Sequence, residues 1–460
     1  MRTNIVFITI DCLRSDSLGI TNKNVKTPFI DSLAKKGVFF RNTIASSPWS
    51  GGSGPSIFTG TYPFSNNGNI SLRDRGESFV EILRKEGYLT IGIHSNPFFT
   101  AENDYNKGFD YFYDWYTSSN KNIHKVKTKL KFKKKLKKIV KKSRLLEFFI
   151  NLFVRLKRQI TRNLLKRIST NYASIKIINN ICKNAVKFYS SKLKTKPIFI
   201  WLHYMDSHEP ITIPQDSISP RIRSKRNYLN SIYRNKKVKK SKQDIKELKR
   251  LYYDSISYID ANIEKTVNYL NRKLDKQTIY IITADHGQGF GENKEHFGHG
   301  LVHLKELLNI PLIIYSQKLK KQKISVNSFV PLQAIGNVIL KTIGYEESFG
   351  SLEAFIDSNL NITPPPYVIA EEGREQEKDF ISKGSYKLNW SKRSFSVFRN
   401  NMYFVYYYQT DTEELYRFKD NKNVISDPKY KIALKEFRHI LKKHIKNHYK
   451  KSGIVNKIRI

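Results

Sequence analysis

The sequence predicts an α/β fold in which a mostly parallel central sheet carries helices on both faces. Two patterns lead to this prediction. Apolar, β-branched strands alternate with helical segments along the chain, and each of these strands ends in a cluster of polar residues. The chain has 460 residues, of which 39% are hydrophobic and 13% aromatic, so it holds enough apolar material for a large core.

The first strand and helix lie at the amino terminus. The run NIVFITI, residues 4–10, ends at Asp11 and has the composition of a central strand. The stretch TPFIDSLAKKGVFF predicts a helix that begins near Thr27 and stops at Gly37. The amino-terminal apolar run is too short for a signal peptide and passes directly into charged residues, so we expect a strand there.

Later stretches repeat this plan. A helix over SFVEILRKEG precedes the strand LTIGIHS, and the strands in KPIFIWLHYM and TIYIITA follow further helical segments. The polar residues after these strands are Asn96, Asp206, His208, Asp285 and His286. Ligands of open α/β sheets bind beyond the carboxyl ends of the strands, so we expect these side chains to converge with Asp11.

Two regions depart from the pattern. Residues 121–170 hold nineteen Lys and Arg residues and one acid, Glu147, with apolar residues at helical spacing from Leu145 to Ile160. This predicts a basic amphipathic helix, either packed on the domain or lying on an anionic membrane surface. After about residue 365, Tyr- and Phe-rich alternations such as YKLNW, FSVFR and MYFVYYYQ predict an antiparallel sheet, closed by a helix from about Lys429.

We therefore divide the chain into residues 1–350, a catalytic domain with the basic insertion at about 121–170, and residues 351–460, a smaller α+β subdomain. The net charge of +42 has two explanations, a codon bias toward Lys, Asn, Ile, Tyr and Phe or a surface that binds an anionic partner. Nucleic acid is the less favoured partner, because no recognition module is evident.

The cysteine content indicates a reducing compartment. Cys12 and Cys182 are too few for a disulfide framework, and there is no run of about eighteen apolar residues that could span a bilayer. We expect a cytoplasmic protein, with peripheral membrane contact as an alternative.

The clearest chemical motif is TADHGQGFGE, in which Asp285 and His286 follow a predicted strand. Together with Asp11 they offer two carboxylates and an imidazole, a reasonable set for a divalent cation. The alternative is a helix cap for Asp285 and a loop side chain for His286. His299, between two glycines, and His208, in a loop, are further site candidates, whereas His203 lies within a strand and reads as structural.

Several motifs in a fixed order resemble the sulfatases of the alkaline phosphatase superfamily. They are FITIDCLRSDSLG, TPFIDSLAKKGVFFRNTIASSPWS with SIFTGTYP, SNPFF with GFDYFYD, HYMDSHEP, TADHGQGFGE with HFGHG and IPLIIYS, and EELYRFKD. The resemblance covers most of the chain outside the basic insertion. It implies an α/β sandwich, one divalent metal ion and a nucleophile that attacks a sulfate or phosphate ester.

The resemblance also implies the nucleophile. Sulfatases carry Cys-x-Pro-Ser-Arg nine residues before a Thr-Gly pair, and counting back from Thr59 places Ser50 at that cysteine. Gly52 and Gly54 replace the proline and arginine that formylglycine formation requires, so we expect Ser50 to remain a serine with open surroundings. The alternative is a glycine-rich turn with no nucleophile.

By the same resemblance, Asp11, Ser50, Asp285 and His286 are the metal ligands, and the metal is Ca²⁺, Mg²⁺, Mn²⁺ or Zn²⁺. His208 or His299 protonates the leaving oxygen, and Asn96 and Arg14 contact the substrate, although a structural salt bridge explains Arg14 equally well. Cys12 stands where sulfatases have a second aspartate, and His286 where they have asparagine. The pattern Asp-x-x-Arg-x-Asp at residues 11–16 resembles the phosphonate and phosphodiester hydrolases, which favours phosphate-type esters without excluding sulfate.

Three functions remain open at this point. The first is a hydrolase of sulfate or phosphate-type esters on an anionic substrate such as a glycan or a lipid headgroup. The second is a phosphoethanolamine-type transferase that modifies a lipid or glycan. The third is a catalytically silent binding protein, which the altered nucleophile loop would allow.

Overall fold

A computed structural model describes residues 3–115, 174–235, 238–274, 277–293, 295–316, 324–357, 361–373 and 392–449. The basic segment 121–170 and the stretch YKLNW at 386–390 lie outside these residues, so the predictions made for them stay predictions.

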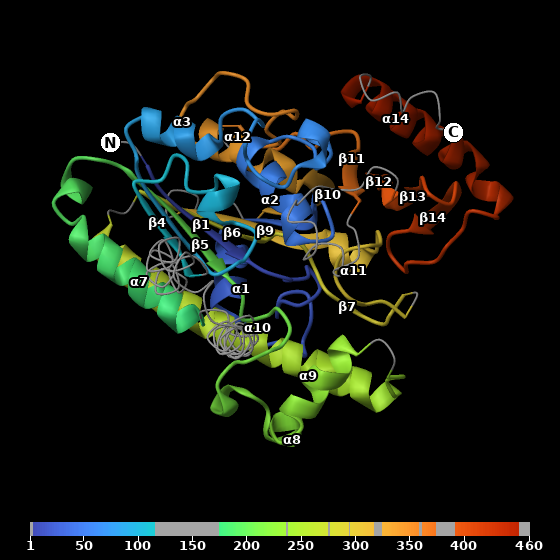
Figure 1. The fold of residues 1–460 in the computed structure, drawn as a ribbon, viewed down its shortest axis with the longest axis horizontal. Helices are drawn as coiled ribbons and strands as arrows, with labels where there is room; N and C mark the ends of the chain where they lie inside the picture. Colours follow the sequence, from blue (N-terminus) through green and yellow to red (C-terminus); the bar gives the residue numbers. More distant parts are fainter. Residues whose placement is uncertain are drawn as a thin grey trace, which may run out of the picture.

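The central sheet has eight strands in the order β10-β2-β9-β6-β1-β5-β3-β4 (Figure 1). Their bounds are β1 Asn4–Ile10, β2 Val38–Ile44, β3 Leu89–His94, β4 Tyr111–Asp114, β5 Ile198–Tyr204, β6 Thr278–Ala284, β9 Asn309–Ser316 and β10 Ile324–Pro331. Only β9 runs antiparallel to its two neighbours, and the remaining pairs of this sheet are parallel. The predicted mostly parallel sheet is confirmed.

Helices cover both faces of this sheet (Figure 1). One layer contains α1 (Pro28–Lys36), α7 (Ile175–Phe188) and α10 (Lys242–Lys273), in which α10 contacts both of the others. The opposite layer contains α2 (Ser50–Thr59), α3 (Phe79–Lys85) and α12 (Ile335–Lys341), which contact one another. Shorter helices lie in the connections, namely α8 (Pro220–Arg223), α9 (Arg226–Arg234) and α11 (Lys305–Leu308). The prediction of helices on both faces is confirmed.

The carboxyl-terminal part forms the predicted antiparallel sheet. It has the order β11-β12-β13-β14, with bounds Val368–Glu372, Ser394–Arg399, Met402–Tyr407 and Thr412–Arg417. The closing helix α14 (Lys431–His448) packs on β12 and begins two residues after the predicted start. A further two-stranded sheet pairs β7 (Gly289–Phe290) with β8 (Phe297–Gly298).

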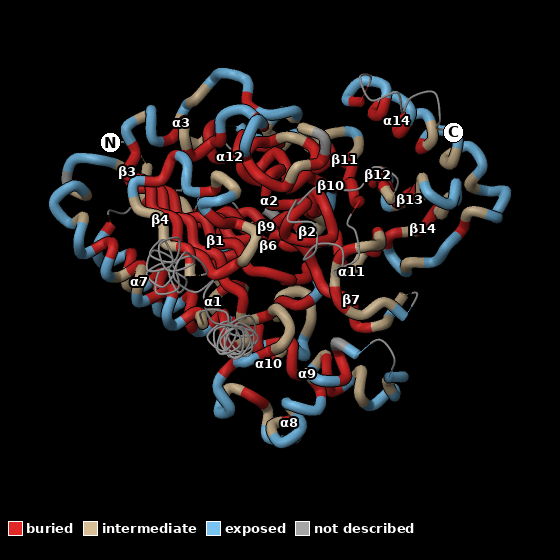
Figure 2. The backbone as a smooth tube through the Cα atoms, in the orientation of Figure 1, coloured by how far each residue is buried: buried red, intermediate tan, exposed pale blue. Residues whose placement is uncertain are grey.

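The inner strands β1, β3, β5 and β6 are buried along nearly their whole length, whereas the outer strands β4 and β10 are partly exposed (Figure 2). Helix α2 is fixed on this core by aromatic contacts, since the ring of Phe58 lies 4.8 Å from that of Trp201 in β5 and 5.7 Å from that of Phe79 in α3. A second apolar cluster joins Trp49, beside α2, to Phe395 and Phe404 of the carboxyl-terminal sheet. The two parts of the chain therefore hold the amino terminus of α2 between them.

No helix among the described residues is both long enough and apolar enough to cross a bilayer.

A carboxylate from α10 secures the start of α1. Asp260 is buried, and its two oxygens accept hydrogen bonds from the backbone N–H groups of Ile30 at 2.7 Å and Phe29 at 3.2 Å. Thr27, the residue at the helix cap position, makes no capping bond of its own with its side chain. Asp260 therefore satisfies two of the N–H groups that every helix leaves without an intrahelical partner.

We expect Asp260→Ala to lower the free energy of unfolding by about 1–2 kcal/mol, because two buried backbone donors lose their acceptors. Chemical denaturation of the full chain measures this difference. Glu264→Ala, an exposed position on the same helix, is the matched control and should change stability by less than about 0.5 kcal/mol. Equal stability of the two variants would contradict the capping role.

Candidate active site

Four neighbouring parallel strands bring the predicted site residues to one edge of the sheet. Asp11 follows β1, Asn96 follows β3 closely, and the pair Asp285 and His286 follows β6. These strands are joined through the sheet order β6-β1-β5-β3, so their carboxyl ends lie side by side. Ser50 enters the same place from the first residue of α2.

The hydroxyl of Ser50 lies at the centre of this group. Its Oγ donates to Asp11 Oδ2 at 3.2 Å and lies 3.2 Å from His286 Nε2. All three side chains are almost fully buried. At the amino terminus of a helix, the backbone dipole also favours negative charge on an oxygen at this position. The environment therefore suits a serine that reacts as its alkoxide.

Asn96 fixes the same oxygen atoms from the β3 side. Its Oδ1 accepts from the backbone N–H of Phe98 at 2.9 Å, which directs Nδ2 toward Asp11 Oδ2 and Ser50 Oγ, each at 3.0 Å. An amide N–H in this position can also donate to an anionic oxygen of a substrate. Asn96 thus contacts both Asp11 and Ser50, a position that agrees with the predicted substrate contact.

Hydrogen-bond partners orient the two ring nitrogens of each histidine in the site. His286 Nδ1 lies 2.9 Å from the carbonyl oxygen of Gly287, a contact that places the proton on Nδ1 and turns the lone pair of Nε2 toward Ser50. His203 Nδ1 lies 2.8 Å from Thr9 Oγ1, and its Nε2 lies 3.4 Å from Asp11 Oδ2. His203 is therefore part of the site and not only of the strand.

The two carboxylates have different electrostatic environments. Burial by itself raises the pKa of Asp11, but neighbouring histidines, His208 first among them, hold that pKa well below its ordinary value. Burial raises the pKa of Asp285, and the negative charge of Asp11 raises it further. One oxygen of each carboxylate lies within 4.8 Å of the other and of His203, and two buried carboxylates this close together are stabilised by a cation.

The donor set fits a divalent metal ion. Asp285 Oδ2 is buried and accepts no hydrogen bond from the described residues, although His286 Nε2 lies 3.5 Å away. With Asp11, Ser50 and His286 it presents three oxygens and one imidazole nitrogen, ligand types that Ca²⁺, Mg²⁺, Mn²⁺ and Zn²⁺ all accept.

The glycines of α2 are required by close packing, and not by the open surroundings that we expected from the sequence. A Cβ atom on Gly52 would lie 2.2 Å from Ser47 Oγ, and one on Gly54 would lie 2.4 Å from the ring of Phe99. Phe99 is buried, so it has little room to move. An arginine side chain at position 54 would occupy the same space as this ring.

The backbone before Ser50 is held by distant segments. Ser47 Oγ donates to Glu372 Oε2 at 3.0 Å, and the N–H of Glu371 donates to the carbonyl oxygen of Ser46 at 2.9 Å. The N–H of Gly300 donates to the carbonyl oxygen of Pro48 at 2.7 Å. Strand β11 and the loop that carries His299 thus position the start of α2.

Arg14 is engaged by protein groups. Its guanidinium pairs with Asp16 at 2.6 Å and with Glu292 at 2.6 Å, and it donates to the carbonyl oxygen of Gln288 at 3.1 Å. Of the two explanations given from the sequence, this geometry favours the structural salt bridge.

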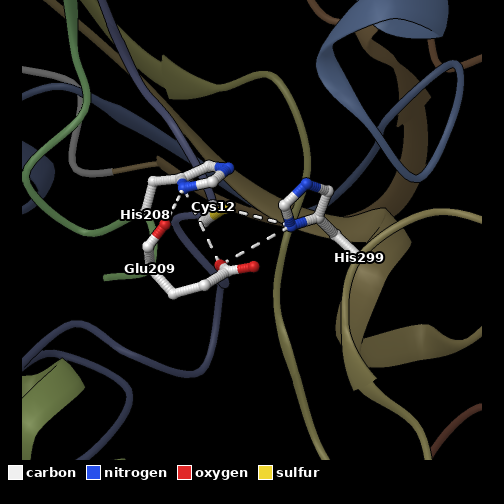
Figure 3. Close-up of side chains that lie close together, drawn as sticks. All are labelled: Cys12, His208, Glu209 and His299. Carbon is white, nitrogen blue, oxygen red and sulfur yellow. Dashed lines mark hydrogen bonds and ion pairs between the residues drawn. The ribbon is translucent and has the colours of Figure 1, made fainter. Parts of the chain in front are cut away.

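His208 and His299 meet beside the Ser50 group, and Cys12 and Glu209 lie with them (Figure 3). The rings of His208 and His299 are 4.9 Å apart between centroids, and that of His299 lies 4.6 Å from that of His286. Asp206, by contrast, accepts from the backbone N–H of Ile175 at the start of α7. His303 is buried with its Nδ1 2.8 Å from Ser396 Oγ, as a packed histidine would be.

Sequence reasoning missed Glu209 and Gln288 in this region and interpreted His203 as structural only. His203 pairs in register with Thr9, two residues before Asp11. Side chains two apart in a strand share a face, so the alternation of β1 together with that register would have placed His203 beside Asp11. Glu209 and Gln288 lie in loops, where no periodic signal exists.

A protein-family model described as Sulfatase matches residues 3–345. The chain belongs to the sulfatase family. Members of this family generally use a divalent metal ion, and the described residues include groups that could hold one.

The relatives and solved structures agree with this family. The chain is 32% identical over 122 residues to an ulvan-active sulfatase of Formosa agariphila and 24% identical over 331 residues to the iduronate 2-sulfatase of Mus musculus. These matches cover 24% and 68% of this chain, but only 24% and 59% of the two relatives.

Two solved structures show the same fold. One is BT4656 in complex with its substrate D-glucosamine-2-N,6-O-disulfate, with a TM-score of 0.66, 16% identity and coverage of 98% of this chain and 99% of that one. The other is the phosphonate monoester hydrolase of Agrobacterium radiobacter, with a TM-score of 0.65, 15% identity and coverage of 97% and 96%.

We expect Gly54→Ala to destabilise the protein by about 1–2 kcal/mol. Alanine in a helix gains up to about 1 kcal/mol over glycine, but forcing a methyl group against Phe99 costs about 1–3 kcal/mol. Thermal and chemical unfolding measure the difference. The second substitution Phe99→Leu should recover part of the loss in the Gly54→Ala background, and an increase in stability for Gly54→Ala alone would contradict the packing argument.

Proposed function

We propose that this chain is a metal-dependent hydrolase that cleaves sulfate or phosphate-type esters with unmodified Ser50 as the nucleophile. The observation that supports this most directly is the placement of Ser50 Oγ, 3.2 Å from both Asp11 Oδ2 and His286 Nε2 at the amino terminus of α2. Family membership supports the reaction class.

Asp11, Asp285, His286 and Ser50 Oγ are the proposed ligands of one divalent cation. A cation held there supplies positive charge, which lowers the pKa of the serine hydroxyl and stabilises negative charge on the ester oxygens. The remaining steps fall to the protein's own side chains.

Ser50 first loses its hydroxyl proton to solvent water; the resulting alkoxide Oγ attacks the sulfur or phosphorus atom, and the bond from that atom to the leaving oxygen breaks. Asn96 Nδ2, already 3.0 Å from Ser50 Oγ, donates to a non-bridging oxygen of the ester. His208 or His299 gives a proton to the leaving oxygen. Water then cleaves the seryl ester and returns the enzyme to its starting state.

The substrate class follows from the relatives only in outline. One structural neighbour is in complex with a disulfated glucosamine, and another is a phosphonate monoester hydrolase. We therefore propose an anionic ester, carried by a glycan or by a lipid headgroup. The nineteen basic residues of segment 121–170 suit contact with an anionic membrane, and the low cysteine content suits a cytoplasmic location.

A phosphoethanolamine-type transferase is the second candidate. Serine in place of cysteine at the nucleophile position favours it, because a seryl ester can pass its group to an acceptor hydroxyl as well as to water. Release of sulfate or phosphate with no acceptor present supports the hydrolase, and turnover only with an acceptor alcohol supports the transferase.

We expect Ser50→Ala to lower kcat/KM by about 10³-fold or more, because the attacking oxygen is lost. Rates on a panel of aryl sulfates, phosphate monoesters and diesters, and phosphonates measure this effect. Ser56→Ala is the matched control on the same helix. Its buried Oγ makes no hydrogen bond within the described residues, so the rate should stay within a few-fold of wild type. Equal rates for wild type and Ser50→Ala would remove Ser50 from the mechanism.

We expect a chelator to abolish turnover and one of Ca²⁺, Mg²⁺, Mn²⁺ or Zn²⁺ to restore it. Asp285→Asn should weaken binding of that ion, since the variant loses a negatively charged ligand. Metal content of the purified proteins and activity after re-addition measure both effects. Full activity without any bound metal ion would contradict the proposal, whereas a chain with neither metal ion nor activity would favour the silent binding protein.

A further inference from the structure

Two adjacent carboxylates at the end of β11 contact the chain on both sides of helix α2. Glu371 and Glu372 are the last two residues of the strand, and both are buried. Neighbouring side chains of a strand point to opposite faces, so the two carboxylates reach different parts of the chain. One accepts a hydrogen bond from the segment after α2, and the other from the segment before it.

Glu371 fixes the end of β11 to the segment after α2 and to the carboxyl-terminal part of the chain. Its Oε2 accepts from the backbone N–H of Phe64 at 2.9 Å. Its Oε1 lies 2.7 Å from His444 Nε2 and accepts from the hydroxyl of Tyr449 at 2.5 Å. The N–H of the same residue donates to the carbonyl oxygen of Ser46 at 2.9 Å. These bonds fix the position of the strand end relative to α2.

The side chain of Glu372 reaches the residue three positions before Ser50. Its Oε2 accepts from Ser47 Oγ at 3.0 Å, and both side chains are almost fully buried. A buried hydrogen bond of this kind is costly to break, because the groups that lose their partner are shielded from water. Glu372 therefore fixes the position of the Ser47 side chain.

Ser47 lies against the first turn of α2. A Cβ atom on Gly52 would lie 2.2 Å from Ser47 Oγ, so this hydroxyl fills the space beside the turn. Ser53 Oγ accepts from the N–H of Ser47 at 3.1 Å and donates to its carbonyl oxygen at 2.8 Å. A displacement of Ser47 is therefore transmitted to the turn that begins with Ser50.

The first turn of α2 has no capping bond from the residue at its cap position. The side chain of that residue, Trp49, accepts no hydrogen bond from the helix. Its carbonyl oxygen accepts from the N–H groups of Gly52 and Ser53 at 3.2 and 3.0 Å. Serine, threonine, asparagine and aspartate commonly hold a helix start from the cap position. In α2 the contacts of Ser47 hold the helix start instead.

We propose that Glu372 is a positioning residue for Ser50 and that it acts through Ser47. Its effect on turnover rests on the proposed function, in which Ser50 Oγ attacks the ester. That oxygen lies 3.2 Å from Asp11 Oδ2 and from His286 Nε2, so its place is set by the turn that carries it. A misplacement of a reacting atom by about 1 Å can cost about 100-fold in rate.

The alternative is that Glu372 and Ser47 only stabilise the fold. In that case Glu372→Ala makes the protein easier to unfold but leaves the kcat of the folded protein unchanged. The hydrogen bond needs an acceptor at position 372, and the side-chain oxygen of glutamine accepts from a hydroxyl as a carboxylate oxygen does. A positioning role therefore predicts a loss of kcat for alanine and recovery for glutamine.

Steady-state kinetics of the full chain on the panel of sulfate, phosphate and phosphonate esters tests the proposal. We expect Glu372→Ala and Ser47→Ala each to lower kcat by about 10- to 100-fold, with KM within about threefold of wild type, because the attack is misaligned and substrate binding is not. The double variant should be within about twofold of the slower single variant, since both substitutions remove one bond. Glu372→Gln should keep kcat within about threefold of wild type.

Thr59→Val is the matched control at the other end of α2. Thr59 is buried, and its Oγ1 donates to the carbonyl oxygen of Pro55 at 2.7 Å. The variant loses a buried hydrogen bond of the same helix, so its melting temperature should fall about as far as that of Ser47→Ala, with kcat within about threefold of wild type. If circular dichroism shows Glu372→Ala to be unfolded, Ser47→Ala takes its place in the test. Unchanged kcat in the folded variant, or an equal loss in Thr59→Val, overturns the proposal.

Amide hydrogen exchange separates this proposal from the proposed function, because it needs no substrate. The N–H groups of Gly52 and Ser53 close the first turn of α2, and that of Gly60 closes the last. We expect both alanine variants to exchange at least about tenfold faster than wild type at Gly52 and Ser53 and at the same rate at Gly60. Unchanged exchange at all three amides overturns the proposal even where the serine is the nucleophile. Faster exchange at the first turn, in a chain whose turnover does not need that serine, supports the contact and refutes the proposed function alone.

Discussion

The site depends on the parallel arrangement of β6, β1, β5 and β3. Parallel neighbouring strands end at the same edge of the sheet, so the residues that follow them meet there. This holds even for residues that lie far apart in the chain. Asp11, Asn96 and Asp285 reach the site in this way. The strands are almost entirely buried, and this burial makes the positions of their ends rigid (Figure 2).

Ser50 is held by a different set of forces. Helix α2 is packed on the central sheet through Phe58, and the residues before it are bound to β11 of the carboxyl-terminal sheet. Trp49 lies in the apolar cluster of that second sheet. The small sheet therefore helps to hold Ser50, the proposed nucleophile, even though it supplies none of the proposed ligands.

Electrostatics explains why histidines gather around the carboxylates. Asp11 and Asp285 are both fully buried, and the pKa of Asp285 is raised by burial and by the charge of Asp11. Ser50 and Asn96 offset this negative charge only in part, because each donates a single neutral hydrogen bond to Asp11 Oδ2. Burial, and then the charge of Asp11, raise the pKa of the Cys12 thiol well above its ordinary value, so Cys12 adds no negative charge to this group.

The sequence by itself determined the central strands, α1 and the order of the polar strand ends, because burial and capping leave local patterns in composition. With the family resemblance it also pointed to Ser50. It did not reveal that His203 faces Asp11, that Gly54 packs against Phe99, or that Glu209 lies with Cys12 and His299. Those relations come from strand register and loop packing between distant segments, which tertiary structure alone decides, since no local pattern records which side chains will meet.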